Sequence, residues 1–208
     1  IDPETGEMRD TIFTRLLGER LLDITHNAVR EADPEAQLVY NDYMSWDTGH
    51  EAHRDGVLAL IQGMRERGAP LDALGLQSHI WAGSSIESTG FDPTRDETWR
   101  DFLSAATSMD VDLLVTEFDV NGTNLPFDIE GRDRAIAELA EHYLSLVLSF
   151  EQTRDVLVWG MADPYSWLQN LWPRPDGEAK RPTPYDANFQ AKPMRDAIAR
   201  AFINAVPR

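Results

Sequence analysis

The feature that most constrains the fold of this chain is an apolar run that ends in two acids. Residues 113–120 read Leu-Leu-Val-Thr-Glu-Phe-Asp-Val, with Glu117 and Asp119 at alternate positions. Side chains two apart on a strand share a face, so both carboxylates point the same way. Buried parallel strands carry few acids along their length, and their C-terminal ends are where α/β proteins place chemistry. The pattern predicts a strand that ends in a functional site, with Glu117 as the main candidate.

Three other apolar segments begin aliphatic and finish polar or aromatic, at residues 37–43, 71–80 and 155–160. Amphipathic stretches between and around them predict helices. These helices are expected over residues 10–31, 51–67, 94–109, 131–150 and 192–205. The order is therefore one helix followed by four strand-helix units, which predicts a parallel sheet with helical crossovers.

A doubly wound sheet and a barrel both fit this order. The first usually carries a glycine-rich phosphate loop after a strand, and no such motif occurs here. Polar residues at all four strand ends favour the rim of a TIM (β/α)8 barrel. A complete barrel needs about 250 residues, whereas this chain has 208 and begins at Ile1 rather than Met. We therefore expect residues 1–208 to be part of a single catalytic barrel domain, with half of the barrel absent.

Charge and composition restrict the possible partners. The chain has 36 acidic and 19 basic residues, a net charge of -17, which disfavours nucleic acid and anionic lipid, although a solvated surface is the plainer interpretation. No apolar run approaches the roughly 18 residues of a membrane helix. The absence of cysteine excludes disulfides and thiolate metal sites. These features predict a globular protein outside the membrane.

The longest irregular segment, residues 162–188, is rich in proline and aromatic residues. A loop this long in a compact domain is usually functional. Its rings are Tyr165, Trp167, Trp172 and Tyr185. Indole faces at the end of a strand suit the C–H faces of sugars. The rings could equally pack the loop against the barrel rim, and both interpretations stay open on this feature alone.

Four segments together carry a resemblance to a known family. They are residues 33–43 (Asp-Pro-Glu-Ala-Gln-Leu-Val-Tyr-Asn-Asp-Tyr), 75–79 (Gly-Leu-Gln-Ser-His), 115–120 (Val-Thr-Glu-Phe-Asp-Val) and 158–167 (Val-Trp-Gly-Met-Ala-Asp-Pro-Tyr-Ser-Trp). In this order and spacing they resemble strands five to eight of glycoside hydrolase family 10, the retaining endo-β-1,4-xylanases. The resemblance implies that the chain is the C-terminal half of such a barrel.

The resemblance also implies roles for individual residues. Glu117 corresponds to the nucleophile that attacks the anomeric carbon, and His79 and Asp119 hold its orientation and charge. The positions that correspond to substrate-binding residues are Asn41, Tyr43, Gln77, Trp159 and Trp167. No metal or organic cofactor is implied, and the expected partner is xylan or a xylo-oligosaccharide. By contrast Trp99, Phe102 and Leu103 lie within a helical pattern, which predicts that they belong to the core.

The chain departs from the family in one respect that concerns catalysis. A retaining mechanism needs two carboxyl groups about 5–5.5 Å apart. The family's acid/base glutamate precedes the segment that resembles residues 1–14, so it lies outside this chain. Trp81 and Lys180 do not match the sugar-binding positions of the family's first half. Four strands alone expose two sheet edges. We expect a cover from a separate half-barrel chain, a second copy or a further part of the same protein.

The expected function is endo-hydrolysis of β-1,4-xylosidic bonds with retention, through a glycosyl-Glu117 intermediate. One alternative is a non-catalytic xylan-binding or scaffold fragment that is inactive without the missing half-barrel. Another is a metal-dependent hydrolase with His79, Glu117, Asp119 and Asp42 as ligands, which lacks the usual zinc-site signatures. Because xylan does not enter cells, we expect the parent protein to be secreted or periplasmic, although this chain carries no targeting segment.

Overall fold

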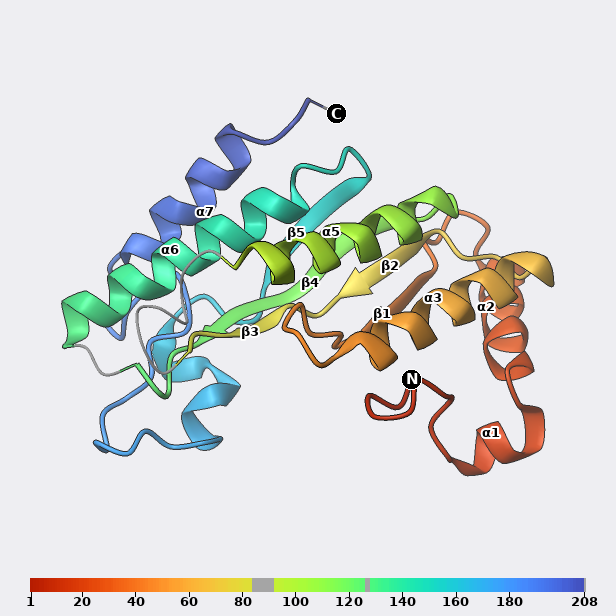
Figure 1. Ribbon diagram of the computed structural model, residues 1–208, viewed down its shortest axis with the longest axis horizontal. Helices are drawn as coiled ribbons and strands as arrows, with labels where there is room; N and C mark the ends of the chain where they lie inside the picture. Colours follow the sequence, from red (N-terminus) through yellow and green to blue (C-terminus); the bar gives the residue numbers. More distant parts are fainter. Residues whose placement is uncertain (84–91, 126–127, 208) are drawn as a thin grey trace.

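The computed structural model describes residues 1–83, 92–125 and 128–207. Strands and helices alternate along the chain as predicted (Figure 1). The helices are α1 (Ile12–Leu17), α2 (Arg20–Ala32), α3 (Glu51–Glu66), α5 (Pro93–Ser108), α6 (Ile129–Val147) and α7 (Pro193–Ile203). The strands are β1 (Val39–Asp42), β2 (Ala73–Leu76), β3 (His79–Trp81), β4 (Asp112–Asn121) and β5 (Thr153–Val158).

All strand pairs of the sheet are parallel, as the sequence predicts. β1 pairs with β2, β2 with the first part of β4, and β5 with β4. β3 continues the line of β2 and pairs with the last part of β4. Every strand therefore points its C-terminal end to the same edge, where the loop after β5 forms the short helices η1 (Asp163–Tyr165) and η2 (Trp167–Asn170).

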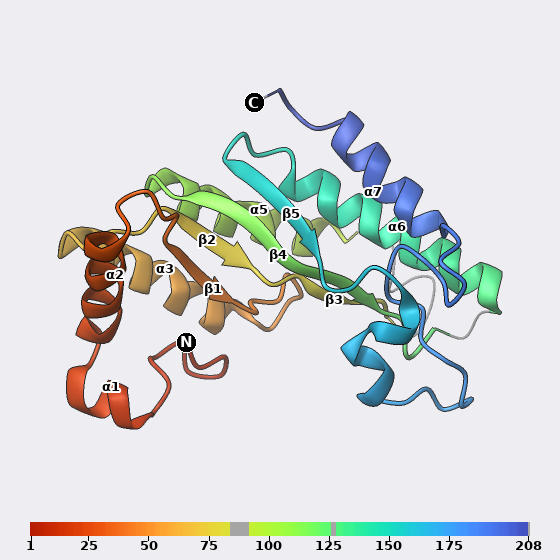
Figure 2. The ribbon, with the colours of Figure 1, turned by 180° about the vertical axis from the view of Figure 1, so that it is seen from behind.

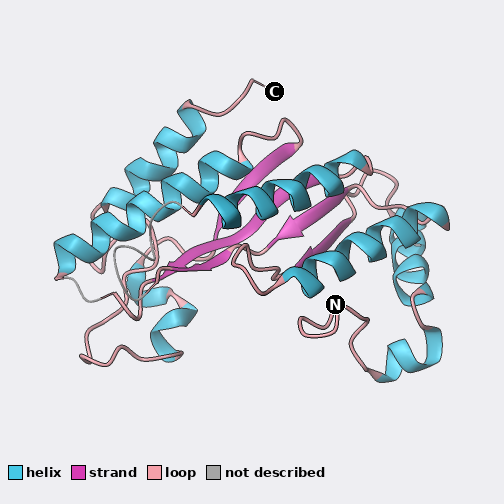
Figure 3. Cartoon of the chain, in the orientation of Figure 1, coloured by secondary structure: helices cyan, strands magenta, loops and turns pink. Residues whose placement is uncertain are grey.

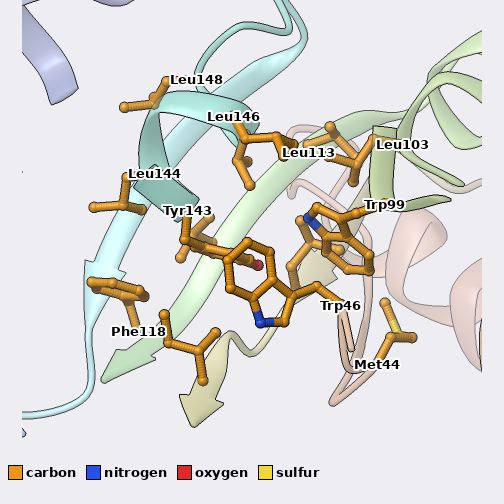
Figure 4. Close-up of a cluster of buried hydrophobic side chains, with 14 of the residues drawn as sticks. Met44, Trp46, Trp99, Leu103, Leu113, Phe118, Tyr143, Leu144, Leu146 and Leu148 are labelled. Carbon is orange, nitrogen blue, oxygen red and sulfur yellow. The ribbon is translucent and has the colours of Figure 1, made fainter. Parts of the chain in front are cut away.

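The helices α3, α5 and α6 cover one face of the sheet, α7 packs beside α6, and the view from behind shows the strands of the other face in front (Figures 1 and 2). The same division is visible when the elements are coloured by type (Figure 3). The apolar core lies between the sheet and these helices, with Trp46, Trp99, Phe118 and Tyr143 among its buried rings (Figure 4). The predicted core positions Trp99, Phe102 and Leu103 are all buried, so that prediction is confirmed.

The prediction of one continuous helix over residues 10–31 is wrong, because the structure has two helices there. The helical stretch breaks at Gly18, whose φ of 59° lies in the left-handed region that glycine tolerates. The two pieces, α1 and α2, bury no residue fully. Apolar side chains on α1 are instead exposed, notably Ile12, Phe13 and Leu16.

The strand predicted over residues 71–80 is also interrupted. Ser78 has a φ of 62°, which ends β2 and starts β3 one residue later. Its hydroxyl group lies 2.8 Å from the hydroxyl of Tyr143 on α6 and donates to the Leu76 carbonyl. The interruption at Ser78 thus goes with a tertiary contact to the core. No local pattern in the sequence predicts this interruption. Among the described residues, no helix is both long enough and apolar enough to cross a membrane.

Candidate active site

The candidate site begins with an irregularity in β4. Val115 and Phe118 are both buried in the helix-covered core, although three positions separate them. The pairing with β5 shifts register between these two residues. Such a bulge turns two consecutive side chains, Thr116 and Glu117, to the opposite side of the strand. Within these few residues, the side chains of β4 therefore change from packing in the core to lining a polar site.

The interruption at Ser78 has a similar effect on the neighbouring strand line. With Ser78 turned into the core, Gln77 and His79 on either side of it both line the cleft at the strand ends. His79 pairs in register with Asp119 of β4. The fold thus places an imidazole directly beside the two acids that alternate at the end of β4.

Glu117, His79 and Asp119 form a continuous hydrogen-bonded chain. Nδ1 of His79 is 2.9 Å from Oδ1 of Asp119, and Nε2 is 3.2 Å from Oε2 of Glu117. The Asp119 side chain is 1% exposed, whereas Glu117 and His79 keep 17% and 19% of theirs. The indole Nε1–H of Trp167 donates to the second oxygen of Asp119 at 2.7 Å. Asp119 is therefore fully engaged and buried, and Glu117 is the carboxylate that reaches the cleft.

The second oxygen of Glu117 is held from β1. The Asn41 amide Nδ2–H donates to Oε1 of Glu117 at 3.0 Å, and the Thr116 hydroxyl donates to Oδ1 of the same amide at 2.7 Å. Thr116 thereby fixes which end of the amide faces the carboxylate. Hydrogen-bonding partners therefore orient both oxygens of Glu117.

Burial disfavours the charged form of His79, but the hydrogen bond and charge of Asp119, followed by those of Glu117, outweigh it and raise the pKa of His79 above its ordinary value. Because each ring nitrogen faces a carboxylate oxygen, both hydrogen bonds form together only when both nitrogens carry a proton. In that doubly protonated form the ring of His79 links the side chains of Asp119 and Glu117.

The cleft has a volume of about 770 Å³ and contains most of the residues predicted to bind substrate. Tyr43, Gln77, Trp159 and Trp167 line it together with His79, Glu117 and Asp119. Asn41 contacts Glu117 from the side of the sheet. The Trp159 ring lies edge-on to His79 at 6.3 Å, and the Trp167 ring lies 4.8 Å from it. The structure brings all eight predicted site residues to one edge of the sheet.

Other residues of the cleft were missed by the sequence analysis. They are Pro3, Ser45, Asp47, His50, His53, Trp81, Asn121 and Leu168. For two of them, the sequence does contain a signal that predicts their position. Asn121 lies two residues after Asp119 and Trp81 two residues after His79, so strand alternation places each on the same face as its predecessor. Trp172, one of the loop rings considered for sugar binding, also lines the cleft.

Asp42 does not join the carboxylate chain, contrary to the metal-site hypothesis. Its carboxylate accepts hydrogen bonds from the Tyr40 hydroxyl and the Tyr43 backbone N–H, and it lies 3.2 Å from Nε2 of His53. In the ranges that the structure describes, no group of three or more His, Asp or Glu side chains is placed to hold a metal ion. The residues proposed as a ligand set are thus not arranged as one.

Parallel strands whose C-terminal ends carry this cleft define a protein of the TIM-barrel class. The chain belongs to glycosyl hydrolase family 10, whose family model matches residues 1–201. This confirms the resemblance inferred from the four motifs. The described sheet and helices form part of the barrel of that family.

Individual relatives agree with this assignment. Endo-1,4-beta-xylanase B of Paenibacillus barcinonensis is 34% identical over 193 residues, which cover 89% of this chain and 54% of that protein. Endo-1,4-beta-xylanase 1 of Humicola insolens is 29% identical over 199 residues, which cover 94% of this chain and 42% of that protein. The chain spans about half the length of the curated relatives it matches and corresponds to their C-terminal part.

Solved structures show the same relation in space. The crystal structure of native xylanase 10B from Thermotoga maritima superposes on this chain with a TM-score of 0.80 at 25% identity. The match covers 96% of this chain and 57% of that chain. The family 10 structure from Paenibacillus barcinonensis gives a TM-score of 0.71 at 26% identity, with 90% and 52% covered. The sheet, its helices and the loop after β5 therefore correspond to part of a larger barrel.

Proposed function

We propose that this chain carries the nucleophile of a retaining endo-1,4-β-xylanase, and that the nucleophile is Glu117. The observation that carries the proposal is the donor arrangement around its carboxylate. Asn41 donates to one oxygen and His79 to the other, and the group is still exposed to the cleft. An ionised carboxylate with fixed orientation and solvent access is what attack on a sugar carbon requires.

In this mechanism an oxygen of Glu117 attacks the anomeric carbon and forms a covalent glycosyl ester, while the bond to the leaving sugar oxygen breaks. A second carboxyl group protonates that oxygen and then deprotonates the water that hydrolyses the ester. Retention follows from two inversions at one carbon. We place the second carboxyl group outside this chain. His79 and Asp119 act as positioning residues, because they contact the nucleophile and each other.

The substrate class is supported by the cleft and by the relatives. Trp159 and Trp167 offer indole rings beside His79, and Gln77 and Tyr43 offer polar groups in the same cleft. This combination of rings and hydrogen-bonding groups suits a pyranose chain. The relatives of Paenibacillus and Humicola are named endo-1,4-beta-xylanases. Xylan or a xylo-oligosaccharide is therefore the substrate we assign. No step of this reaction calls for a cofactor, and a polymeric substrate favours a secreted or periplasmic parent protein.

A complete site needs a cover for the open side of the half-barrel. Ile12, Phe13 and Leu16 on α1 and Leu157 on β5 are large apolar side chains left exposed. Exposed apolar groups of this kind mark contact surfaces. We propose that they contact a half-barrel with the first four strands, equivalent to the remaining half of the relatives, rather than a second copy. Because that half would supply the acid, the chain alone is also compatible with a sugar-binding fragment that lacks turnover.

The nucleophile can be tested independently of the missing acid. A dinitrophenyl xylobioside that carries fluorine in place of the hydroxyl next to the anomeric carbon has a leaving group that departs without protonation, and the fluorine slows hydrolysis of the ester. We expect the intact mass of the chain to rise by one fluoroxylobiosyl unit and peptide mapping to place the label on Glu117. The increase should be absent in Glu117→Gln.

The matched control is Glu141→Gln, which changes a half-buried glutamate that pairs with Arg200 on the helix side and leaves the cleft unchanged. This variant should be labelled as the wild type is. A label on another acid, such as Asp47, would reject Glu117 as the nucleophile. If the folded chain takes no label alone but does so when the first four strands are supplied, the half-barrel is required to hold the sugar.

A further inference from the structure

The cleft continues past Trp167 to two more tryptophans. Trp81 at the end of β3 and Trp172 in the loop after η2 both line it, with 38% and 51% of their surfaces exposed. Their ring centroids lie 5.1 Å apart at 65°, and the Trp172 ring is 6.1 Å from that of Trp167. We propose that Trp81 and Trp172 form an additional carbohydrate-binding position, which holds one further sugar ring of the substrate; this inference rests on the function proposed above.

The conformation of Trp172 indicates that its exposure is built into the fold. Its φ is 47°, in the left-handed region that bulky residues rarely occupy. A residue in such a region is strained and persists only where the surroundings fix it. Strain of this kind is concentrated at ligand-contacting sites. An exposed indole held in a strained backbone is a feature that packing alone does not explain.

Two buried cations fix the backbone on either side of Trp172. The Arg174 guanidinium donates to the carbonyl groups of Gly122, Thr123 and Leu125, beyond the end of β4. The Lys180 ammonium donates to the carbonyl groups of Leu168 and Leu171. Both side chains are almost fully buried, and burial followed by the charge of Arg174 lowers the pKa of Lys180. Such anchors pre-organise a ring for binding, because less conformational freedom is lost when a ligand binds.

A polar group completes the position. Asn121 lines the same cleft and is in register with Trp81 across the β3–β4 pair. Its Oδ1 accepts hydrogen bonds from the Thr123 backbone N–H and hydroxyl. Its Nδ2 is buried and has no acceptor among the residues that the structure describes. A buried amide donor without a partner is costly, and a sugar hydroxyl that reaches it would relieve that cost.

These three residues lie just outside the motifs that identify the family. Trp81 follows the segment 75–79, Asn121 follows 115–120 and Trp172 follows 158–167. The family resemblance therefore assigns them no role, and we infer their role from their geometry in this chain. Two rings set edge to face and one donor suit a ring with C–H faces and hydroxyl edges, which is the chemistry of a pentose.

The test uses the tryptophan side chains as reporters. The chain has six tryptophans, whose indole N–H signals can be resolved by NMR and assigned with single Trp→Phe variants. We would titrate the chain, carrying Glu117→Gln to prevent turnover, with xylobiose, xylotetraose and an arabinose-substituted xylotriose. We expect the signals of Trp81 and Trp172 to shift with one of the longer ligands, while those of the buried Trp46 and Trp99 stay in place. A shift with linear xylotetraose assigns a backbone xylose, and a shift only with the substituted ligand assigns a branch.

A matched pair of variants measures the contribution to affinity. Trp172→Ala should weaken binding of the responding ligand by about tenfold, the loss of one ring contact. Trp172→Phe should recover part of the loss. Tyr165→Ala removes a ring that is 75% exposed on the same loop but outside the cleft, and it should leave affinity unchanged.

The outcomes separate this inference from the proposed function. Shifts confined to Trp159 and Trp167, with none at Trp81 and Trp172, would overturn the additional position and leave the proposed sugar cleft intact. No shift at any of the four, combined with normal labelling of Glu117 by the fluoroxylobioside, would also overturn the additional position alone. Absence of both shifts and labelling when the first four strands are supplied would overturn this inference together with the proposed function.

Discussion

The helix-covered face of the sheet and its open face differ in what the same strands bury. Under α3, α5 and α6, side chains such as Val57, Leu74 and Trp99 have no exposed surface. On the opposite face Asn41 and Leu157 remain exposed, one polar and one apolar. The first face therefore holds the chain in its fold, and the second carries the candidate site and exposed apolar side chains. Stability and function depend on different sides of the same strands.

The largest stability effect should come from the covered face. Trp99 is fully buried and stacks on Phe102 at 5.0 Å, and its indole nitrogen has no hydrogen-bond partner within the described ranges. Trp99→Ala should lower the free energy of unfolding by about 3–5 kcal/mol, through lost burial and the cavity left behind. Urea unfolding followed by circular dichroism measures this. A loss below about 1 kcal/mol would mean that the core of the isolated chain is loosely packed.

The covered face is also the part that the sequence predicted best. Apolar residues such as Trp99 and Leu103 recur with the period of a helix. They therefore lie on one face of it, and that face is buried. The two failures were Gly18, which breaks the first helix, and Ser78, which breaks a strand. Glycine occurs inside many helices, so Gly18 alone does not mark a boundary. Ser78 turns toward Tyr143, which lies 65 residues further along the chain, and such a contact leaves no local pattern.

The site was predictable where it follows strand alternation and motif, and not where it depends on tertiary structure. Glu117 and Asp119 could be placed on one face from their spacing alone. The bulge that turns Thr116 toward Asn41 arises from the pairing of β4 with β5, which the sequence does not specify. Trp172 reaches the cleft because Arg174 and Lys180 fix its loop. Their role becomes visible only in the folded chain.

An intermediate effect is expected where the two faces meet, at His79. Its pKa is raised in the folded state, so the stability it contributes is fully present below its unfolded pKa of about 6.5 and is lost as pH rises through the raised value. Hydrogen bonds to charged groups contribute about 1.5–3 kcal/mol, which bounds the loss. Differential scanning calorimetry between about pH 6 and pH 9 should show a fall in stability that His79→Gln removes.

The control for this pH dependence is His26→Gln, because Nδ1 of His26 contacts the carbonyl of Pro70 rather than a carboxylate. This variant should keep the wild-type profile. If His79→Gln retains the full fall in stability, another group carries it and the imidazolium between Glu117 and Asp119 is not the cause. Labelling of Glu117 should decline over the same pH range, since the Nε2–H donor to Glu117 is lost together with the charge.

In the isolated chain, the smallest effect is expected on the open face, at Leu157. Its neighbours Val156 and Val158 pair with Val115 and Phe118 of the core, so alternation turns Leu157 to the other side, where it is 51% exposed. In the isolated chain, Leu157→Ala should change the free energy of unfolding by no more than about 0.5 kcal/mol. When the first four strands are supplied, the same substitution should cost about 2–5 kcal/mol, because the side chain would then be buried. Equal effects in both states would mean that the added half-barrel does not cover this face, and the sheet would need a different partner.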